Sequence, residues 1–465
     1  MQITGSKILI LGGFGLVGSA VTRKLMQHNP AQIIIASLRK EEAESACKQL
    51  IEEFPNVNPN MFVPKFIVTT TNMGASDVFA FEMSAQGTFT VDWDDATVET
   101  IDRSATTSSN TYRHQYQTAG TRDIKFGGVA TGYNENGASS FKVHSDSVTK
   151  VASLSGSLGG LMPTLGQTSA LQPTFVNTFL GCTNLTSVPV GLFNGVNGNR
   201  DHMFSGTFAG TGLTGSGVPS GLFSNITGHA SNLFASTFAG CTNLTSVPQG
   251  LFSSVSGADT QMFMYTFGNT GLTGQNALPS DLFSHVTGNA EALFQSTFED
   301  CTSLTTIPGS LFSGITGSAA YMFENTFSGC SSLASIPGNL FSGVTGGANS
   351  LFLFTFANCS ALTSLPAGLF SGINQAAQWM FNQTFVNCTH LTGYIPASMF
   401  SGLIAAGSPN IDGTEVYPSI PGMMNSMFAN NGGLVGNGNC PTGTTQVTTG
   451  YEQYWGGAVA CQPNS

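Results

Sequence analysis

Apolar residues recur with a period of about 29 residues between Phe175 and Leu403. A Thr-Phe pair marks each of eight units, another Phe lies four residues before the pair, and a Cys or Thr follows three residues after it. The phenylalanines of the pairs lie 29–31 residues apart and are Phe179, Phe208, Phe238, Phe267, Phe298, Phe327, Phe356 and Phe385. One unit of this length cannot bury its own apolar face, so the pattern predicts units that stack on one another.

Within a unit, the pattern predicts one helical segment and one strand. Phe352 and Phe356 are four residues apart and would share one face of a short helical or 3₁₀ turn. The segment Cys359–Leu365 alternates polar and apolar residues as a strand does, and Pro366 would end its pairing because proline lacks an N–H. We therefore expect a solenoid of eight units, about 40 Å long at the strand spacing of about 4.8 Å.

Upstream of the repeats, from about residue 62 to 151, the hydrophobic pattern has period two. Phe79–Met83, Thr88–Trp93 and Ile124–Phe126 are predicted strands. Gly87, Gly120 and the pair Gly127-Gly128 are the predicted turns between them. We expect this stretch to form a β-sandwich.

The first 60 residues follow a third pattern, in which strands alternate with helices. Lys7–Leu11 and Gln32–Ala36 are apolar runs typical of buried strands, and helical stretches follow at Ser19–Gln27 and Lys40–Phe54. A glycine-rich turn lies between the first strand and the first helix. It consists of Gly12, Gly13, Phe14, Gly15, Leu16, Val17 and Gly18. Glycines let a backbone approach a phosphate, and the N-terminus of a helix favours negative charge, so this turn is a candidate phosphate site.

Charge is scarce and unevenly distributed in this chain. Charged residues make up 8% of the 465 residues, the formal net charge is −11, and Arg200 is the only Lys or Arg between Leu154 and Asn439. A basic nucleic-acid binder is excluded, because phosphate neutralisation needs clustered Lys and Arg. We expect no membrane span, because no apolar run reaches about 18–20 residues. Met1–Gly5 is uncharged and carries no recognisable secretory signal.

Six of the nine cysteines occupy one position of the repeat, and we expect them to form a buried thiol ladder that fills small spaces in the core. A metal site is the alternative, although no Cys-x-x-Cys pair is present. Cys440 and Cys461 lie outside the repeats, and a disulfide between them would require an oxidising compartment.

The repeat resembles the BspA-type leucine-rich repeat over about Phe175–Leu403. The motif Thr-Phe-Ala-Asn-Cys-Ser-Ala-Leu-Thr-Ser-Leu-Pro, residues 355–366, carries this resemblance. Members of that family are mostly surface or secreted proteins of adhesion and recognition. The resemblance therefore implies an α/β repeat solenoid that binds a protein or a glycan on a cell surface.

Two segments of the middle stretch resemble the PKD-type immunoglobulin-like fold. They are residues 89–97, with Trp93-Asp94-Asp95-Ala96 in place of a Trp-Gly-Asp-Gly turn, and residues 114–121, with a His-x-Tyr-x-x-x-Gly step. The cluster Asp92, Asp94 and Asp95 is a candidate Ca²⁺ site, because Ca²⁺ takes six to eight oxygen ligands. The alternative, which we favour, is a solvated turn in which Asp92 caps backbone donors.

The N-terminal segment, about Ser6–Asn60, resembles the first half of Rossmann oxidoreductases of the saccharopine-dehydrogenase type. Ser37 and Arg39 end its second strand and would suit the 2′-phosphate of NADP. A complete dinucleotide domain needs two such halves. Two interpretations therefore stay open: a truncated relic without activity, and a half-site that a second copy completes.

These patterns predict a multi-domain chain. Residues 1–60 form a partial α/β Rossmann-like unit, 61–152 a PKD/Ig-like β-sandwich, 153–410 an α/β leucine-rich-repeat solenoid, and 411–465 a C-terminal cap. No catalytic constellation is visible, since the seven histidines are scattered and no Gly-x-Ser-x-Gly elbow is present. We expect a non-enzymatic interaction protein at the cell surface or secreted. An NADP-dependent oxidoreductase in the cytoplasm is the alternative.

Overall fold

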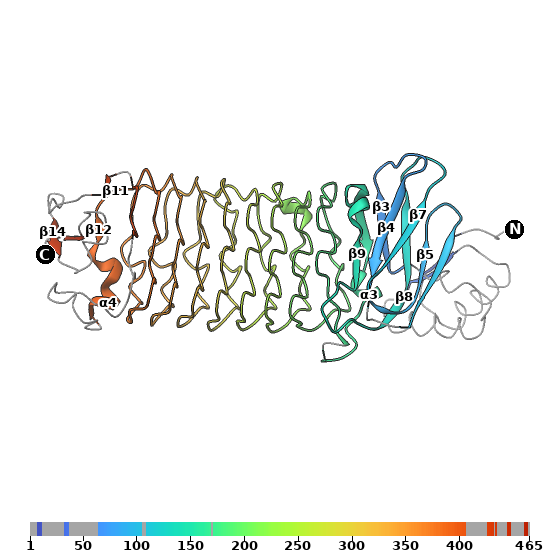
Figure 1. The fold of residues 1–465 in the computed structure, drawn as a ribbon, viewed down its shortest axis with the longest axis horizontal. Helices are drawn as coiled ribbons and strands as arrows, with labels where there is room; N and C mark the ends of the chain where they lie inside the picture. Colours follow the sequence, from blue (N-terminus) through green and yellow to red (C-terminus); the bar gives the residue numbers. More distant parts are fainter. Residues whose placement is uncertain are drawn as a thin grey trace.

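The computed structural model describes residues 64–104, 108–168, 171–405, 426–431, 433–434, 444–447 and 460–463, together with the strands 7–11 and 32–36. Two parts make up the bulk of the described chain: a β-sandwich and, C-terminal to it, a long row of stacked coils (Figure 1). We use "coil" for one repeat unit of about 29 residues. No helix in the described residues is long and apolar enough to cross a membrane.

The β-sandwich consists of two antiparallel sheets. The larger has the strand order β10-β3-β8-β5-β6 and the smaller the order β7-β4-β9. The strands are β3 (Phe66–Thr70), β4 (Val78–Met83), β5 (Gln86–Asp92), β6 (Val98–Arg103), β7 (Asn110–Gln115), β8 (Asp123–Gly132), β9 (Phe141–Val143) and β10 (Val151–Gly156). The 3₁₀ helix η2 (Ser145–Lys150) and the short helix α3 (Leu158–Leu161) flank β10. The three strands expected from the period-two pattern correspond to β4, β5 and β8.

Aromatic side chains fill the space between the two sheets. Phe66, Phe81, Phe126 and Phe141 contact one another at ring-centroid distances of 5.1–5.8 Å. Trp93 is fully buried beside Phe81. Every second residue of these strands points inward, as the period-two pattern requires.

Two of the glycine positions taken for turns lie inside strands instead. Gly87 is in β5 and Gly128 is in β8, with φ of 143° and 92°. A Cβ atom at Gly128 would lie 2.2 Å from the carbonyl oxygen of Thr88 on the neighbouring strand. Glycine is needed here for a close approach of two strands rather than for a chain reversal.

The expected α/β leucine-rich-repeat solenoid is wrong. Between Phe175 and Leu391, a range that the structure describes throughout, there is one 3₁₀ turn, η4 (Gly215–Gly217). This range contains no α-helix, and its only β-pairing consists of isolated bridges. The segment Phe352–Phe356 is a series of turns, and Cys359–Leu365 is not a strand. The coils are instead built from consecutive tight turns and extended stretches.

Backbone hydrogen bonds explain how turns replace helices. From Tyr321 to Cys330, every second N–H donates to the carbonyl three residues back in its own coil, as Thr326 does to Phe323. The alternate N–H groups donate to the following coil, as Phe323 does to Leu351 at 3.0 Å and Phe327 does to Thr355 at 2.9 Å. Half of the donors therefore close turns and the other half join coils, so every backbone N–H of this stretch is paired.

A left-handed residue at every fourth position keeps this part of the coil from becoming a helix. In the coil of Phe352 these residues are Ser350, Phe354 and Asn358, with φ of 54–60°. A type II turn needs a positive φ at its third residue, and glycine, asparagine and aspartate adopt it at least cost. In all eight coils, the second residue after the Phe of the Thr-Phe pair is Gly, Asn or Asp and has a positive φ. These residues are Gly181, Gly210, Gly240, Asn269, Asp300, Gly329, Asn358 and Asn387.

Three phenylalanine ladders run through the core of the stack. In the ladder of the Thr-Phe pairs, successive rings are 5.4–5.7 Å apart and within 14° of parallel. The ladder four residues upstream has steps of 5.5–5.7 Å. The third ladder, from Phe193 to Phe400, has steps of 5.8–6.1 Å. Each fully buried Phe contributes about 1.5–3 kcal/mol through burial.

A ladder of buried threonines ties neighbouring coils together next to the rings. Thr355 donates its hydroxyl to the carbonyl of Phe323 in the preceding coil at 2.9 Å. The hydroxyl of Thr384 lies within hydrogen-bond distance of two carbonyls, that of Phe352 in the preceding coil at 2.9 Å and that of Phe381 in its own coil at 2.8 Å. Each such carbonyl also accepts an N–H within its own coil, so both of its lone pairs are used.

The sandwich provides the first rung of the stack. In β9 and beside it, Val143 and Ser140 donate their N–H groups to Thr178 and Thr174 of the first coil at 2.9 and 2.8 Å. Thr178 donates its hydroxyl back to the carbonyl of Phe141 at 2.9 Å. The carbonyl of Phe141 thus takes the place that a repeat phenylalanine carbonyl takes in later coils, and the open end of the stack is covered.

The far end of the stack is covered by residues 426–431. Phe428 stacks on Phe385 at 5.4 Å, and Phe385 donates its N–H to Met427 at 2.8 Å. Short elements accompany this end: β11 (Thr392–Gly393), β12 (Ile395–Pro396), η5 (Ala397–Phe400), α4 (Ser401–Ala405), β13 (Gly433–Leu434), β14 (Thr444–Val447) and β15 (Ala460–Pro463). β11 pairs with β13, and β15 lies between β12 and β14.

The two apolar runs of the N-terminal segment are strands in the structure. β1 (Lys7–Leu11) and β2 (Gln32–Ala36) pair in parallel, with Leu9 opposite Ile34. The helical stretches expected at Ser19–Gln27 and Lys40–Phe54 lie outside the described residues.

We predict that Thr355→Val lowers the free energy of unfolding by about 1 kcal/mol, because it removes one buried inter-coil hydrogen bond while leaving the Phe323 carbonyl with its turn partner. Chemical denaturation followed by circular dichroism measures this loss. Thr363→Val is the matched control: Thr363 is exposed, and the change should stay within about 0.5 kcal/mol. Equal effects of the two changes would refute the role assigned to the threonine ladder.

Candidate functional site

The residues expected to hold NADP flank the two N-terminal strands. β1 ends at Leu11, directly before Gly12, and β2 ends at Ala36, directly before Ser37. Gly12, Gly13, Phe14, Gly15, Leu16, Val17, Gly18, Ser37 and Arg39 lie outside the described residues. Parallel pairing brings the C-terminal ends of the two strands, Leu11 and Ala36, to the same edge of the two-stranded sheet.

The acidic turn of the sandwich is occupied by the protein's own side chains. Lys125 lies 3.0 Å from Asp92 and 3.5 Å from Asp94. His114 contacts Asp95 at 2.7 Å and stacks on Trp93. Burial lowers the pKa of Lys125, but the hydrogen bond and the charge of Asp92 outweigh burial and hold this pKa above its usual value.

The same carboxylates also cap backbone donors, as the favoured interpretation of this turn expects. Asp92 accepts the N–H of Asp94 at 3.0 Å, and Asp94 accepts the N–H of Asp123 at 3.1 Å. Ca²⁺ would have to displace a lysine and a histidine from this turn. Within the described residues no group of three or more His, Cys, Asp or Glu side chains is placed to hold a metal ion.

The six repeat cysteines are free and buried, which confirms the expected thiol ladder. Cys301, Cys330, Cys359 and Cys388 each donate the thiol to a phenylalanine carbonyl of the preceding coil, at 3.1–3.3 Å. Where the unit carries Thr instead, as at Thr211, its hydroxyl lies 3.2 Å from the next sulfur, Sγ of Cys241. The expected disulfide between Cys440 and Cys461 lies outside the described side chains.

Burial raises the pKa of these thiols, to about 12 for Cys182 and Cys388 and to about 11 for Cys301. The thiolate is both the nucleophile and the metal ligand, so a raised pKa makes these positions inert at neutral pH. The ladder is a packing device.

One polar cluster on the coils contains Ser, His and Asp and so invites comparison with a catalytic triad. Ser231 donates its hydroxyl to Asp259 Oδ1 at 2.9 Å, and His229 Nδ1 lies 3.2 Å from Asp259 Oδ2. Both partners therefore bind the carboxylate, and no hydrogen bond joins Ser231 to His229 in this described stretch. A nucleophile needs the imidazole as its base, so this arrangement ties neighbouring coils rather than activating a hydroxyl.

Arg200, the lone basic residue of the repeats, is also structural. Its side chain is buried and donates to the backbone carbonyls of Gln172, Asn134 and Glu135 at 2.6–3.0 Å. These bonds fasten the sandwich to the first coils. The described coils therefore present acidic and neutral groups to solvent but no Lys or Arg.

Two neighbouring positions of each coil vary from coil to coil, and we call the surface that they form the turn face. They are the two residues between each upstream Phe and the Thr-Phe pair: Val176-Asn177, Ser205-Gly206, Ala235-Ser236, Met264-Tyr265, Gln295-Ser296, Glu324-Asn325, Leu353-Phe354 and Asn382-Gln383. No two of these pairs are alike. The segment from the repeat Leu to the Pro keeps its first Leu and its closing Val/Ile/Leu-Pro step in every coil, but its length varies from five residues, as in Leu185–Pro189, to eight in Leu272–Pro279.

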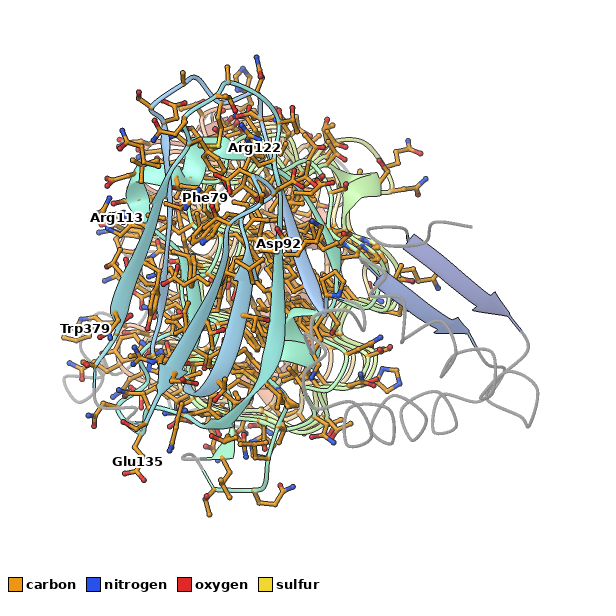
Figure 2. All side chains as sticks on the ribbon, turned by 90° about the vertical axis from the view of Figure 1, so that its right-hand side faces the viewer. Phe79, Asp92, Arg113, Arg122, Glu135 and Trp379 are labelled. Atoms are coloured by element: carbon orange, nitrogen blue, oxygen red, sulfur yellow. The ribbon has the colours of Figure 1, made fainter. Side chains whose placement is uncertain are left out.

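Aromatic side chains gather toward the C-terminal coils of this face. Trp379, just beside the turn face, is 43% exposed, and Figure 2 shows it projecting from the edge of the stack. Tyr321, Phe354 and Trp379 all have left-handed φ angles of 54–58°. The series of turns requires a left-handed residue at these positions, and a bulky residue in that conformation carries strain of order 1–3 kcal/mol, so the backbone does not account for the choice of Tyr, Phe or Trp here.

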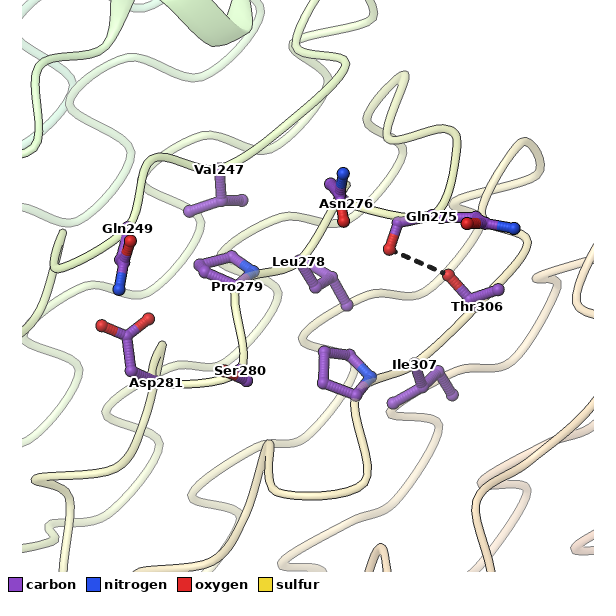
Figure 3. A pocket seen from close by; sticks show the side chains of 11 residues that line it. Val247, Gln249, Gln275, Asn276, Leu278, Pro279, Ser280, Asp281, Thr306 and Ile307 are labelled. Carbon is purple, nitrogen blue, oxygen red and sulfur yellow. Dashed lines mark hydrogen bonds between the residues drawn. The ribbon is translucent and has the colours of Figure 1, made fainter.

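A groove of about 650 Å³ lies over three successive coils, next to their Leu-to-Pro segments (Figure 3). Its floor is apolar and includes Val247, Leu278 and Pro279. Its rim is polar and includes Gln249 and Asp281. The volume is within the range of small-ligand sites, about 300–1,000 Å³.

Sequence reasoning missed this groove, although the repeat length contains its signal. Pro279 lies twelve positions after Phe267, whereas Pro308 lies ten positions after Phe298 in the next coil. The two added residues lengthen one extended stretch and not its neighbour.

No family model, no curated protein and no solved structure matches this chain at a significant level.

We predict that the six repeat thiols resist labelling in the native protein. In a variant with Cys47, Cys440 and Cys461 changed to Ser, Ellman's reagent at pH 8 should find no fast-reacting thiol, because the raised pKa leaves almost no thiolate and burial blocks access. In guanidinium chloride all six should react. Rapid labelling of the native variant would show that the ladder opens.

Proposed function

We propose that this protein is a non-enzymatic interaction protein that binds a protein or a glycan surface through the turn face of its coils. The observation that carries this proposal is the contrast between positions. The core residues repeat from coil to coil, whereas the pairs of the turn face all differ. Stacking of the coils alone does not require such variation.

The composition of the turn face supports a recognition role. Small residues dominate its N-terminal coils, Tyr265 and Phe354 enlarge it further along, and Tyr321 and Trp379 lie beside it in the chain. Aromatic residues are enriched at the centres of protein interfaces, and lysine is depleted there. An extended row of repeats also offers a binding surface longer than a single domain provides.

The charge of the coils restricts the partner. Exposed carboxylates such as Asp201 and Asp300 occur without any exposed Lys or Arg on the described coils. An acidic partner would be repelled, so we favour a neutral or weakly basic one. In this proposal the protein acts outside the cell or at its surface.

The experiment is a screen of the full chain against arrays of cell-surface proteins and glycans, followed by variants. Trp379→Ala should weaken binding to any target at least tenfold, because truncating a central aromatic costs about 2 kcal/mol or more. Affinity should change less than about threefold between low and high salt, because few charges contribute. Thr363→Ala, which lies away from the turn face, is the control and should bind as the unchanged protein does. An array without a hit, or a hit indifferent to Trp379→Ala, would reject this face.

The parallel pairing of β1 and β2 supports a second candidate, a nucleotide-binding function of the N-terminal segment. If it is correct, calorimetry of the full chain should detect NADPH binding that Gly15→Asp abolishes, because a side chain there would fill the space of a phosphate. Absence of heat with the unchanged chain would eliminate this candidate and leave the turn face untouched.

A further inference from the structure

The groove over Val247, Leu278 and Ile307 contains unused hydrogen-bonding groups. Asp281 accepts no hydrogen bond on either carboxylate oxygen in the described structure, and its Oδ1 is shielded from water. The backbone N–H of Leu278, on the groove floor, likewise has no partner among the described residues. A shielded carboxylate oxygen without a donor costs about 1–3 kcal/mol, so an occupant that donates to it would recover that energy.

The groove is particular to this coil. The position of Asp281 is Gly, Ser or Asn in the other coils, as in Gly250, Ser310 and Asn339. The two extra residues of the same unit include Gln275, whose carbonyl accepts the Thr306 hydroxyl at 3.4 Å. The unit that carries the only carboxylate at the position of Asp281 therefore also has the longest Leu-to-Pro segment.

The distribution of groups along the groove indicates the class of ligand. Figure 3 shows Gln249 and Asp281 at one end, Asn276, Gln275 and Thr306 at the other, and Pro279 with Leu278 between them. The lining includes no Lys or Arg, so an anion would meet a carboxylate without compensation. Polar ends on either side of an apolar floor match a chain of rings that has both C–H faces and hydroxyl groups.

We propose that this groove binds a short stretch of an uncharged oligosaccharide. Hydroxyl groups of one sugar ring donate to Asp281 beside Gln249, the C–H faces lie on Pro279 and Leu278, and the next ring meets Asn276 and Thr306. Three coils span about 10 Å at the strand spacing, enough for successive rings. The lining of the groove shares no residue with the turn face, so this site is independent of the function proposed above.

The test is titration calorimetry of the full chain with a panel of defined probes. Cellopentaose, maltopentaose, mannopentaose and N-acetylated chitopentaose are the uncharged members. Trigalacturonate is the anionic comparator, and fully deacetylated chitopentaose is the cationic one. We expect at least one uncharged probe to bind, trigalacturonate not to bind, and Asp281→Ala to weaken the binding at least tenfold.

Two further variants link the binding to the groove. Deletion of Gln275 and Asn276 restores the ten-residue spacing and should abolish binding. Should that variant fail to fold, Gln249→Trp fills the groove from its exposed rim and should have the same effect. Asn339→Ala, at the repeat position of Asp281 two coils further along, is the matched control and should stay within twofold of the unchanged protein.

Three outcomes would overturn the proposal. No uncharged probe binds at millimolar concentration; a probe binds equally well to Asp281→Ala and to the groove-filling variant; or the cationic probe alone binds, which would make the groove a cation site. None of these outcomes bears on Trp379, so failure here is distinguishable from failure of the turn face.

Discussion

The alternation of backbone hydrogen bonds is the constraint on which the stack depends. One N–H closes a turn within its coil, and the next N–H reaches the following coil, as Thr326 and Phe327 do. An α-helix would use every donor within the segment and leave nothing to join the coils. In a β-strand, successive N–H groups would point to the neighbouring coils on opposite sides, and none would close a tight turn within the coil. The series of turns with a left-handed residue at every fourth position satisfies both needs in a short stretch of chain.

The side chains follow from that backbone. Pairs of core residues alternate with residues nearer the surface: Met322-Phe323 and Thr326-Phe327 are fully buried, whereas Glu324, Asn325 and Gly329 are partly exposed. Rings from equivalent positions therefore stack directly, and a threonine hydroxyl reaches the second lone pair of a phenylalanine carbonyl. The stack needs a first and a last member with the same geometry. β9 of the sandwich and residues 426–431 provide them, which explains why a β-sandwich precedes the coils without an intervening linker.

Much of this could be derived from the sequence. The repeat length, the buried positions and the thiol ladder follow from period and composition alone, because every equivalent residue must occupy an equivalent place. The interior of the coil could not be derived in the same way. A four-residue interval between Phe352 and Phe356 suits one helical face and a pair of turns equally well. The glycine, asparagine or aspartate before each Cys or Thr distinguishes them, since these residues favour left-handed φ and are poor in the middle of a helix.

The groove shows a different limit of sequence reasoning. In a regular stack the Leu-to-Pro segments of successive coils lie in line, so they form no concave surface. Lengthening one stretch by two residues disturbs that line locally, while the phenylalanine steps on either side of it are 5.5 and 5.6 Å. The core therefore tolerates the insertion, and the surface absorbs it. Repeat architecture separates the two tasks: identical positions maintain the stack, and departures from identity, in the pairs of the turn face or in the length of one unit, are free to create a site.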